Sequence, residues 1–465
     1  MIKALKDKQF LKRFLTITLP VMVQTLVSFV VTFLDNIMVG GVSNEAVSAV
    51  YAVNQISFLF FVVAYGLFSG AAVYVQQFFG AKDIKHLRQA VVYKLALGTV
   101  FLAIVLPLFY VFGLDIVAFY SRADGNQAAI LAEAARYLPI LLLSYVPLIY
   151  ATVYASTLRE TGRTRIPMLV GIVALAVNGS LNALFIYGLK LGVVGAAIAT
   201  VVARLVEAAA IIYVAHRKKM DFCHGLYREF KVEPRLFKLI TLKMLPLLAN
   251  EFLWSTGMIM LSLSYAQRDN VLSALSILST TTEIFGIVFS GLAVGISVMI
   301  GSTLGAGEID HAKDISKKLM WLGVLISLSV GGLMISVSPF IPRLWVKVDP
   351  FQQALATKMI IVYGAFLWIY SICVSTYHIL RAGGRAALTM VMDSGLMWAA
   401  SVPLAWILAL NTSLPLVPLY VILQSIDIVK MFLGLLLVKH GKWANNLTMQ
   451  VQEPVLVSEV NDLLK

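Results

Sequence analysis

The sequence has little charge and few of the residues that build metal sites or disulfides. Charged residues make up 13% of its 465 positions, and there are 2 cysteines and 6 histidines. Cys223 falls on a predicted loop and Cys373 inside a predicted helix, so we expect no disulfide, and the histidines lack ligand spacing. Basic residues are not interleaved with aromatics, which argues against a nucleic-acid partner. No metal cluster and no cofactor is expected.

Apolar residues are abundant instead. They form 60% of the chain, more than the core of a soluble protein can absorb. They occur in runs close to or above the roughly 20 residues that a membrane-spanning helix needs, and these runs are continuous rather than alternating as in barrel strands. The sequence therefore predicts an all-α integral membrane protein with twelve transmembrane helices, at about residues 14–39, 47–78, 88–112, 130–158, 167–187, 195–215, 244–265, 271–300, 319–341, 354–380, 388–410 and 416–438.

Lys and Arg are distributed unevenly between the predicted loops. Most of the 37 basic residues fall on one side of the membrane when both chain ends share that side, and basic loops mark the cytoplasmic side. The net charge of +13 is therefore a topology signal. We expect a multi-pass protein of the plasma (inner) membrane, with both termini cytoplasmic, surrounded by lipid and acting as a monomer.

The second half of the sequence repeats the first. The landmarks recur at an offset near 222–226: Pro20 with Pro246, Gly80 with Gly305, and Arg159 with Arg381. A constant offset over separate landmarks indicates an internal repeat. Each half holds six spans, an even number, so both halves enter the membrane from the same side as two pseudo-symmetric six-helix bundles. We expect an N-lobe at 1–215, a cytoplasmic linker at 216–243, a C-lobe at 244–438 and a cytoplasmic tail at 439–465.

Two similar bundles that face each other enclose a cavity, and rocking one against the other exposes it alternately to each side of the membrane. In the first helix Gln24, Ser28, Thr32 and Asp35 lie within roughly 80° of arc. Such a polar stripe is energetically unfavourable against lipid, so we expect it to face a cavity or a neighbouring helix. Asp35 has no cation on its own helix, so we expect it to bind a coupling ion. For Ser28 and Thr32 hydrogen bonding between helices is the simpler interpretation.

The second half offers further acids. Glu251 follows Asn250 about one turn after Pro246, which favours a bend, and Glu283 lies on the eighth helix. Neither glutamate has Lys or Arg one turn away, so each is expected to be buried and protonated or to bind H⁺ or Na⁺. Asp393, near the cytoplasmic start of the eleventh helix, is expected to be solvated or to pair with a loop arginine.

Two charged pairs occupy equivalent positions of the repeat. Arg204–Glu207 in the sixth helix and Asp427–Lys430 in the twelfth carry opposite charges at i,i+3, and we interpret both as neutralised structural pairs. Inside the cavity, flat apolar surfaces suit small organic molecules that are aromatic and cationic. The polar and aromatic side chains that are candidates for lining it are Gln24, Asn54, Asn178, Asn182, Asn250, Trp254 and Tyr370.

These landmarks resemble those of the multidrug and toxic compound extrusion (MATE) family over nearly the full length of the chain. The matching segments are "TLP" at 18–20, "DNIMVG" at 35–40, "QQFFGAKD" at 76–83, "LRETGRTRIPM" at 158–168 and "NGSLNALFIYG" at 178–188, with "LGAGE" and "LRAGG" repeated in the second half. The resemblance implies twelve helices around a V-shaped cleft. It also implies multidrug efflux, of the kind that confers antibiotic resistance, with organic and often cationic drugs exported against inward H⁺ or Na⁺.

On this resemblance Asp35 falls on the first-helix acid of the family. Asn178 and Asn182 fall where one bacterial subgroup keeps an Asn and an Asp, so the second position is an amide here. Another subgroup pairs a seventh-helix Glu with a tenth-helix Asp. Glu251 lies about one turn before that Glu, and Tyr370 takes the place of that Asp. These departures leave the coupling ion open between H⁺ and Na⁺.

Two other functions remain open from the residues alone. A flippase for lipid-linked precursors has a related architecture but needs Arg or Lys in its cavity to hold pyrophosphate. Arg204 and Lys430 are the only basic residues that we assign to the membrane interior, because those near the ends of the predicted spans are counted with the loops. An integral-membrane prenyl transferase needs clustered Asp for Mg²⁺, and no span carries paired acids. The glycine-containing turns at Gly80 and Gly305 lack the preceding strand and the following Gly-Lys-Ser/Thr of a phosphate-binding loop. We therefore predict a secondary antiporter that is not an enzyme and does not use ATP.

Overall fold

The computed structural model describes residues 7–122, 126–228, 230–268, 271–346 and 348–452. Within these ranges the side chains of residues 31–34, 36, 37, 40 and 44 are not described. Long helices account for most of the described chain, and no strand occurs in it. This confirms the predicted all-α fold class.

The helices form two bundles that follow each other along the chain. The first bundle holds α2 (Lys8–Gly40), α3 (Asn44–Gly80), α4 (Ile84–Tyr120), α5 (Gln127–Glu160), α6 (Arg165–Asn182) with its extension η1 (Ala183–Gly188), and α7 (Gly192–Arg217). The second holds α8 (Pro234–Tyr265), α9 (Leu272–Gly305), α10 (Ile309–Val337), α11 (Pro350–Ala382), α12 (Ala386–Met390) continuing through η4 (Val391–Gly395) and η5 (Met397–Ser401) into α13 (Val402–Asn411), and α14 (Leu416–Lys439). Short helices η2 (Asp221–Cys223), η3 (Ile341–Leu344) and α15 (Leu447–Gln452) complete the described fold.

The number of spans agrees with the sequence. Within the described residues, eleven helices are long and apolar enough to cross a membrane, with α12 to α13 counted as one. The remaining predicted span is α8, which is 32 residues long and carries Lys243, Asn250 and Glu251 among its apolar residues. Because α8 begins at Pro234, it takes in part of the stretch that the sequence assigns to the linker. The predicted domain boundaries themselves stay a prediction.

Capping residues set several helix starts. The Asp7 carboxylate accepts a hydrogen bond from the Phe10 amide at 3.0 Å, the Ser43 hydroxyl from the Ala46 amide at 3.0 Å, and Asp83 from the His86 amide at 3.1 Å. Each satisfies a donor that the first turn leaves free.

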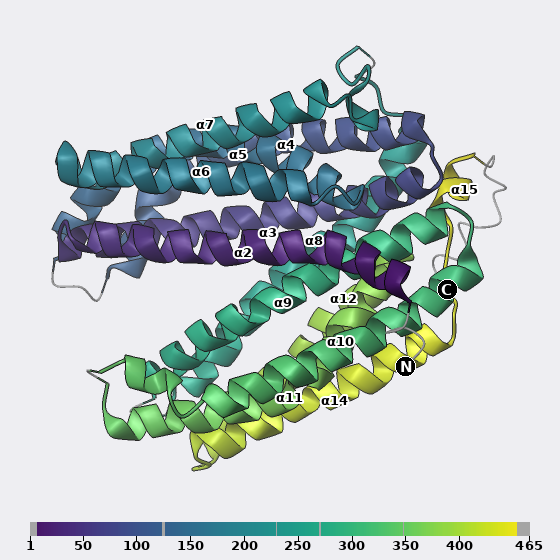
Figure 1. Cartoon of the computed structure of the whole chain (residues 1–465). Coiled ribbons are helices and arrows are strands. Elements are labelled where there is room, and N and C mark those ends of the chain that lie inside the picture. Colours follow the sequence, from purple (N-terminus) through teal and green to yellow (C-terminus); the bar gives the residue numbers. More distant parts are fainter. Residues whose placement is uncertain (1–6, 123–125, 229, 269–270, 347, 453–465) are drawn as a thin grey trace.

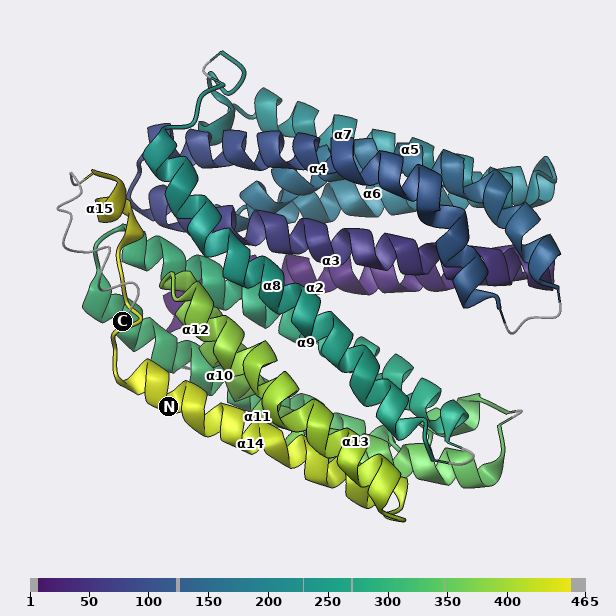
Figure 2. The same cartoon turned by 180° about the vertical axis from the view of Figure 1, so that it is seen from behind.

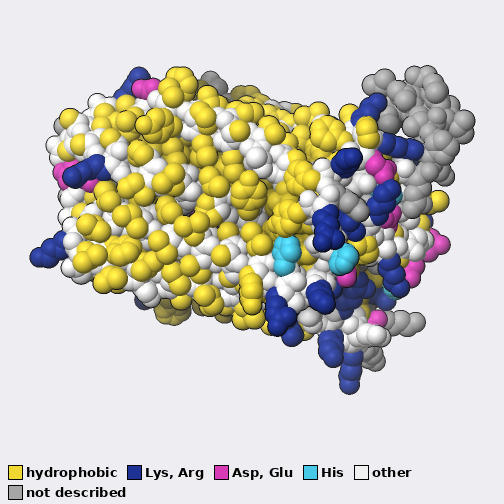
Figure 3. Space-filling model, turned by 90° about the horizontal axis from the view of Figure 1, so that it is seen from above, with side chains coloured by type: hydrophobic (Ala, Val, Ile, Leu, Met, Phe, Trp, Pro, Cys, Tyr) yellow, Lys and Arg dark blue, Asp and Glu magenta, His cyan; other side chains and the backbone are white. Residues whose placement is uncertain are grey.

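The two bundles meet at one end and diverge toward the other. In Figures 1 and 2 the helices converge at the end that carries α15 and the start of α2, and they splay apart at the opposite end. Lys and Arg gather at the convergent end, whereas apolar side chains cover most of the rest of the face seen in Figure 3. A broad apolar band with a basic end is typical of a membrane-embedded surface.

Glycines allow the closest approach at the convergent end. A Cβ at Gly80, the last residue of α3, would overlap the carbonyl oxygen of Ser302 in α9, and a Cβ at Gly305 would overlap the carbonyl oxygen of Gln77. These four residues are equivalent in pairs under the repeat, so the contact is symmetric. Only glycine permits two helices to cross this closely without a backbone shift.

Each bundle also lends the start of its first helix to the other. The apolar core of the first bundle includes Leu236, Ile240 and Met244 of α8. The core of the second includes Phe10 and Phe14 of α2. The two lobes are therefore joined by exchanged helix ends as well as by surface contact.

Candidate functional site: two buried polar clusters

The first cluster surrounds Asp35 on α2. The amide nitrogen of Asn182 donates to Asp35 Oδ1 at 2.7 Å. With the Asn178 amide turned so that its nitrogen faces the acid, that nitrogen lies 2.9 Å from Asp35 Oδ2. Asn178 and Asn182 are 6% and 2% exposed. The i,i+4 asparagines that the sequence placed on one face of the fifth helix thus both point at the acid of the first.

This arrangement suits a carboxyl that exchanges a cation. Two amide donors stabilise a negative charge through charge-assisted hydrogen bonds. Among the described ion pairs none involves Asp35, so no base neutralises it directly. Arg204 pairs at 2.7 Å with Glu207 instead, as the i,i+3 spacing predicts. Neutral donors favour the charged form of a carboxylate without cancelling its charge, so the negative charge can still attract a proton or a small cation.

The second cluster centres on Asn250 of α8. The Asn250 amide nitrogen lies 3.2 Å from Asp393 Oδ2 and 3.3 Å from the Tyr377 hydroxyl, and its oxygen accepts from the Ser394 hydroxyl at 2.6 Å. Lys430 lies between two acids, with its Nζ 3.9 Å from Asp393 and 3.6 Å from Asp427. The cluster joins α8, the irregular stretch after α12, and α14.

Glu251 has a basic partner, contrary to the sequence-based expectation. Arg381 Nη1 lies 3.6 Å from Glu251 Oε1, and the guanidinium also lies over the rings of Tyr65 and Tyr377, at 5.4 and 5.9 Å from their centroids. Arg381 is only 7% exposed. It lies in the last turn of α11, and helical side chains lean toward the N-terminus of their helix. A residue that the sequence counts as a loop cation is therefore directed back into the bundle.

The expectation for Asp393 was also wrong. It lies in the second cluster and pairs with Lys430, and it is neither on the solvated end of its span nor beside a loop arginine. Two π-helical turns, η4 and η5, follow α12 here, and such turns re-aim side chains inside a span. Lys430 is consequently shared between Asp393 and Asp427. The Asp427–Lys430 pair therefore connects α14 to the stretch after α12 and is not confined to its own helix.

A cavity of about 510 Å³ opens beside the second cluster. Of the predicted site residues, Asn250, Glu251, Trp254, Tyr370, Asp427 and Lys430 line it. Tyr65, Tyr377, Arg381 and Asp393 are among the lining residues that the sequence did not predict. Tyr370 packs edge-on against Phe289 with ring centroids 5.1 Å apart. The cavity thus combines aromatic walls with three acids and two bases.

The other predicted residues lie apart from this cavity. Glu283 is exposed on α9 and does not line it, although Ser279 one turn earlier does. Gln24 is half-buried beside Gly171 of α6, and Asn54 is half-buried on α3. Ser28 is exposed, and the side chain of Thr32 falls outside the described residues.

Two six-helix bundles joined at one end, each with a buried polar cluster, define a two-lobed membrane transporter. The chain belongs to the MatE family, whose model matches residues 20–184 and 246–407. This confirms the resemblance drawn from the sequence motifs. Members of the family are multidrug efflux transporters of the membrane and not enzymes, and they act as ion-coupled antiporters that need no cofactor.

Relatives cover most of the chain. It is 26% identical over 390 residues to a probable multidrug resistance protein, YoeA, of Bacillus subtilis, covering 81% of this chain and 82% of the relative. It is 25% identical to a probable multidrug resistance protein, NorM, of Thermotoga maritima, covering 93% of each. Multidrug and toxin extrusion protein 1 of rabbit (Oryctolagus cuniculus) is 23% identical over 92% of this chain and 75% of its own length.

Solved structures share the fold. An outward-facing multidrug resistance MATE family transporter of the MOP superfamily superposes with a TM-score of 0.82 at 20% identity, covering 93% of this chain and 96% of its own. A MOP superfamily transporter from Pyrococcus furiosus gives a TM-score of 0.81 at the same identity and coverage.

Proposed function

We propose that this protein exports organic compounds that are cationic and aromatic, by antiport against H⁺ or Na⁺, through alternating access. The observation that carries the proposal is the Asp35 carboxyl, which is held by two asparagine amides and forms no ion pair with a base among the described residues. An acid in this setting binds a proton or a small cation and releases it again at low cost. The fold and the family support a transporter, and Asp35 is the residue that we propose couples ion binding to export.

The cavity of the second lobe supports the proposed substrate class. Glu251, Asp393 and Asp427 line it with only Arg381 and Lys430 against them, so its formal balance favours a cation. Aromatic walls such as Trp254 and Tyr370 add cation–π attraction. We place the substrate there, with Asn250 as a neutral donor and acceptor.

Coupling requires that ion and substrate prefer different conformations, because a ligand with equal affinity for both shifts nothing. Protonation or ion binding at Asp35 neutralises a half-buried charge and lets α2 repack, with Pro20 inside that helix as the point of bending. Glu251 takes part only when its pair with Arg381 opens. Glu283, exposed on α9, is the third proposed coupling acid. Asn54 and Gln24 are proposed to line the path between the lobes.

The basic, convergent end of the molecule is proposed to face the cytoplasm, with both termini there, in the plasma membrane. On that assignment the lobes are closed toward the cytoplasm and splayed toward the outside, which corresponds to an outward-facing state. One chain contains both bundles, so a monomer suffices for the mechanism.

The test is export of a fluorescent cationic dye from proteoliposomes under separate H⁺ and Na⁺ gradients. Asp35→Asn is expected to lower gradient-driven export to under about a tenth of the original rate, in keeping with removal of an obligatory titrating group. Asp115→Asn, an exposed acid on α4, is the matched control and should export normally. Unchanged export by both Asp35→Asn and Glu251→Gln would overturn the coupling scheme.

A flippase for pyrophosphate-linked lipids is the second candidate, because the cavity holds two bases. Each base faces an acid, Arg381 at 3.6 Å from Glu251 and Lys430 at 3.6 Å from Asp427, which leaves little positive charge for a diphosphate. Reorientation of a labelled polyprenyl diphosphate in the same liposomes distinguishes the two functions. We expect none above protein-free vesicles.

A further inference from the structure

The segment that follows α14 crosses from one lobe to the other. We call residues 441–452, which follow α14 and include α15, the C-terminal strap. Trp443 is 2% exposed and belongs to the core of the second bundle. Leu447 and Val451, 1% and 7% exposed, belong to the core of the first. Between residues 443 and 451 the strap is thus anchored by buried apolar side chains in both lobes.

One side chain joins the strap to both lobes at once. Gln77, near the end of α3, is fully buried. Its amide nitrogen donates to the carbonyl oxygen of Ala382 in α11 at 2.9 Å and to that of Asn445 in the strap at 3.2 Å. Its amide oxygen accepts from the Leu447 backbone at 2.6 Å. Both donor positions of this side chain and its amide oxygen therefore take part in the closed arrangement of the convergent end.

The turn between α11 and α12 is shaped to let the strap pass. A Cβ at Gly383 would overlap the Trp443 carbonyl oxygen, and one at Gly384 would lie 2.8 Å from a Leu447 methyl group. Arg385 holds the strap from the same turn, with Nη2 2.7 Å from the Lys442 carbonyl oxygen. The strap route is therefore built into this turn.

The repeat supplies an internal comparison. The equivalent turn of the first lobe reads Thr161-Gly162 where the second reads Gly383-Gly384, and a Cβ at Gly162 would meet only Val298, at 3.9 Å. Among the described residues, no backbone hydrogen bond joins the strap to that turn, and no strap atom lies within 4 Å of a Cβ placed at Gly162. The extra glycine is thus present only where the strap crosses.

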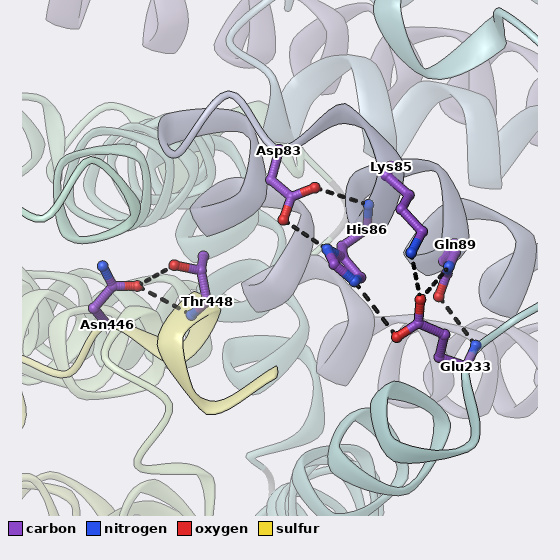
Figure 4. A network of polar contacts seen from close by, with 7 residues as sticks. All are labelled: Asp83, Lys85, His86, Gln89, Glu233, Asn446 and Thr448. Carbon is purple, nitrogen blue, oxygen red and sulfur yellow. Dashed lines mark hydrogen bonds and ion pairs between the residues drawn. The ribbon is translucent and has the colours of Figure 1, made fainter. Parts of the chain in front are cut away.

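A second tie between the lobes lies nearby but is weaker. Figure 4 shows Glu233, just before α8, bonded to Lys85 and Gln89 of α4 and near His86, with Asn446 and Thr448 capping α15 on the other side. The Glu233 side chain is 40% exposed, and exposed ion pairs contribute little. The strap, which buries its apolar anchors, is the stronger of these two ties.

We propose that the C-terminal strap is a latch that holds the convergent end of the transporter closed. Opening that end separates α3 from α9 and α11, so the strap must leave either Gln77 and the first-lobe core or the α11–α12 turn. The latch therefore favours the state in which the other end is open, and its release is a step of the transport cycle. This inference rests on the proposed alternating access and adds a device that sets the balance between its two states.

The experiment measures the distance between the lobes at the convergent end. Spin labels are placed at the exposed positions of Lys218→Cys and Lys317→Cys, with Cys223 and Cys373 replaced by alanine, in full-length protein in lipid nanodiscs. Leu447→Ala with Val451→Ala is expected to raise the long-distance population at least about fivefold. Met449→Ala with Gln450→Ala, on the exposed face of the same helix, is the matched control and should match the parent.

A milder variant keeps the proposal testable if the double variant does not fold. Leu447→Val removes a single methylene and should raise the long-distance population about twofold. A long-distance population equal to that of the Met449 and Gln450 control in every folded strap variant would overturn the latch. Dye export, measured separately, tests the proposed function: absent export in the parent protein together with a strap-dependent distance change would overturn export and support the latch.

Discussion

The Arg381 guanidinium lies 3.6 Å from the Glu251 carboxylate, and both face the cavity of the second lobe. The pair joins the last turn of α11 to the middle of α8. Because Arg381 also contacts the rings of Tyr65 and Tyr377, it touches α3 of the first lobe as well. A change in the charge of Glu251 is thereby felt at the boundary between the lobes.

Breaking this pair from one side should cost more than removing it whole. Glu251→Gln or Arg381→Met alone leaves a buried charge without its partner, which costs about 3–5 kcal/mol in well-buried pairs, with less expected here because the atoms are 3.6 Å apart. The double variant should recover part of that loss. Thermal unfolding in detergent provides the double-mutant cycle. Strictly additive losses would contradict the pairing.

Asn182→Leu should weaken both the fold and the coupling. It removes the 2.7 Å donor to Asp35 and leaves a buried acceptor less satisfied, at a cost of about 1–3 kcal/mol. We expect a lower melting temperature and slower ion-driven export. Asn411→Leu, which alters an exposed asparagine at the end of α13, is the control. Export at the parent rate would show that the amide does not serve the acid.

Gly80→Ala and Gly305→Ala should each disrupt the crossing of α3 and α9. The added methyl would collide with the backbone of Ser302 or Gln77, and overpacking of this kind costs about 1–3 kcal/mol. Gly332→Ala, which meets no atom within 4 Å, should be neutral or slightly stabilising. Melting temperatures in detergent check all three. Equal values for Gly80→Ala and Gly332→Ala would refute the tight crossing.

The linker tie should depend on pH. A hydrogen bond from Lys85, followed by one from Gln89, lowers the pKa of the Glu233 carboxyl below its ordinary value. A lowered pKa in the folded state contributes stability that is present above the ordinary pKa and is lost as the pH falls through the lowered one. At neutral pH the free energy of unfolding of Glu233→Gln should therefore be lower than that of the parent, by less than about 1 kcal/mol, and its melting temperature slightly lower. This difference in melting temperature should disappear in acid. A difference that widens on acidification would contradict this.

Much of the fold follows from the sequence because membrane burial imposes simple requirements. Every span must be apolar and long enough to cross the membrane, which makes the helices recognisable. The constant offset of the repeat predicts that the two halves form equivalent bundles. The site follows less completely. The face shared by Asn178 and Asn182 is readable at i,i+4, yet its contact with Asp35 depends on how α2 packs against α6. Arg381 was assigned to a loop because the predicted span stops at residue 380, whereas α11 continues to Ala382; the sequence pattern also does not predict the direction of this side chain.

The strap lay in a stretch that the sequence treats as a tail. Trp443, Leu447 and Val451 form too short an apolar pattern to predict an element, and their burial depends on grooves made by distant helices. One signal was present: Gly383 stands where the repeat has Thr161. Departures of one half of an internal repeat from the other mark places where the halves do different work.

The exchanged helix ends bear on how the protein is made. The first lobe's core contains Leu236, Ile240 and Met244 of α8, and also Leu447 and Val451 from the strap. A ribosome therefore releases all six helices of that lobe before the residues that complete its interior have been synthesised. The nascent N-terminal half must remain in the bilayer with an incomplete core until Leu447 and Val451 have been synthesised.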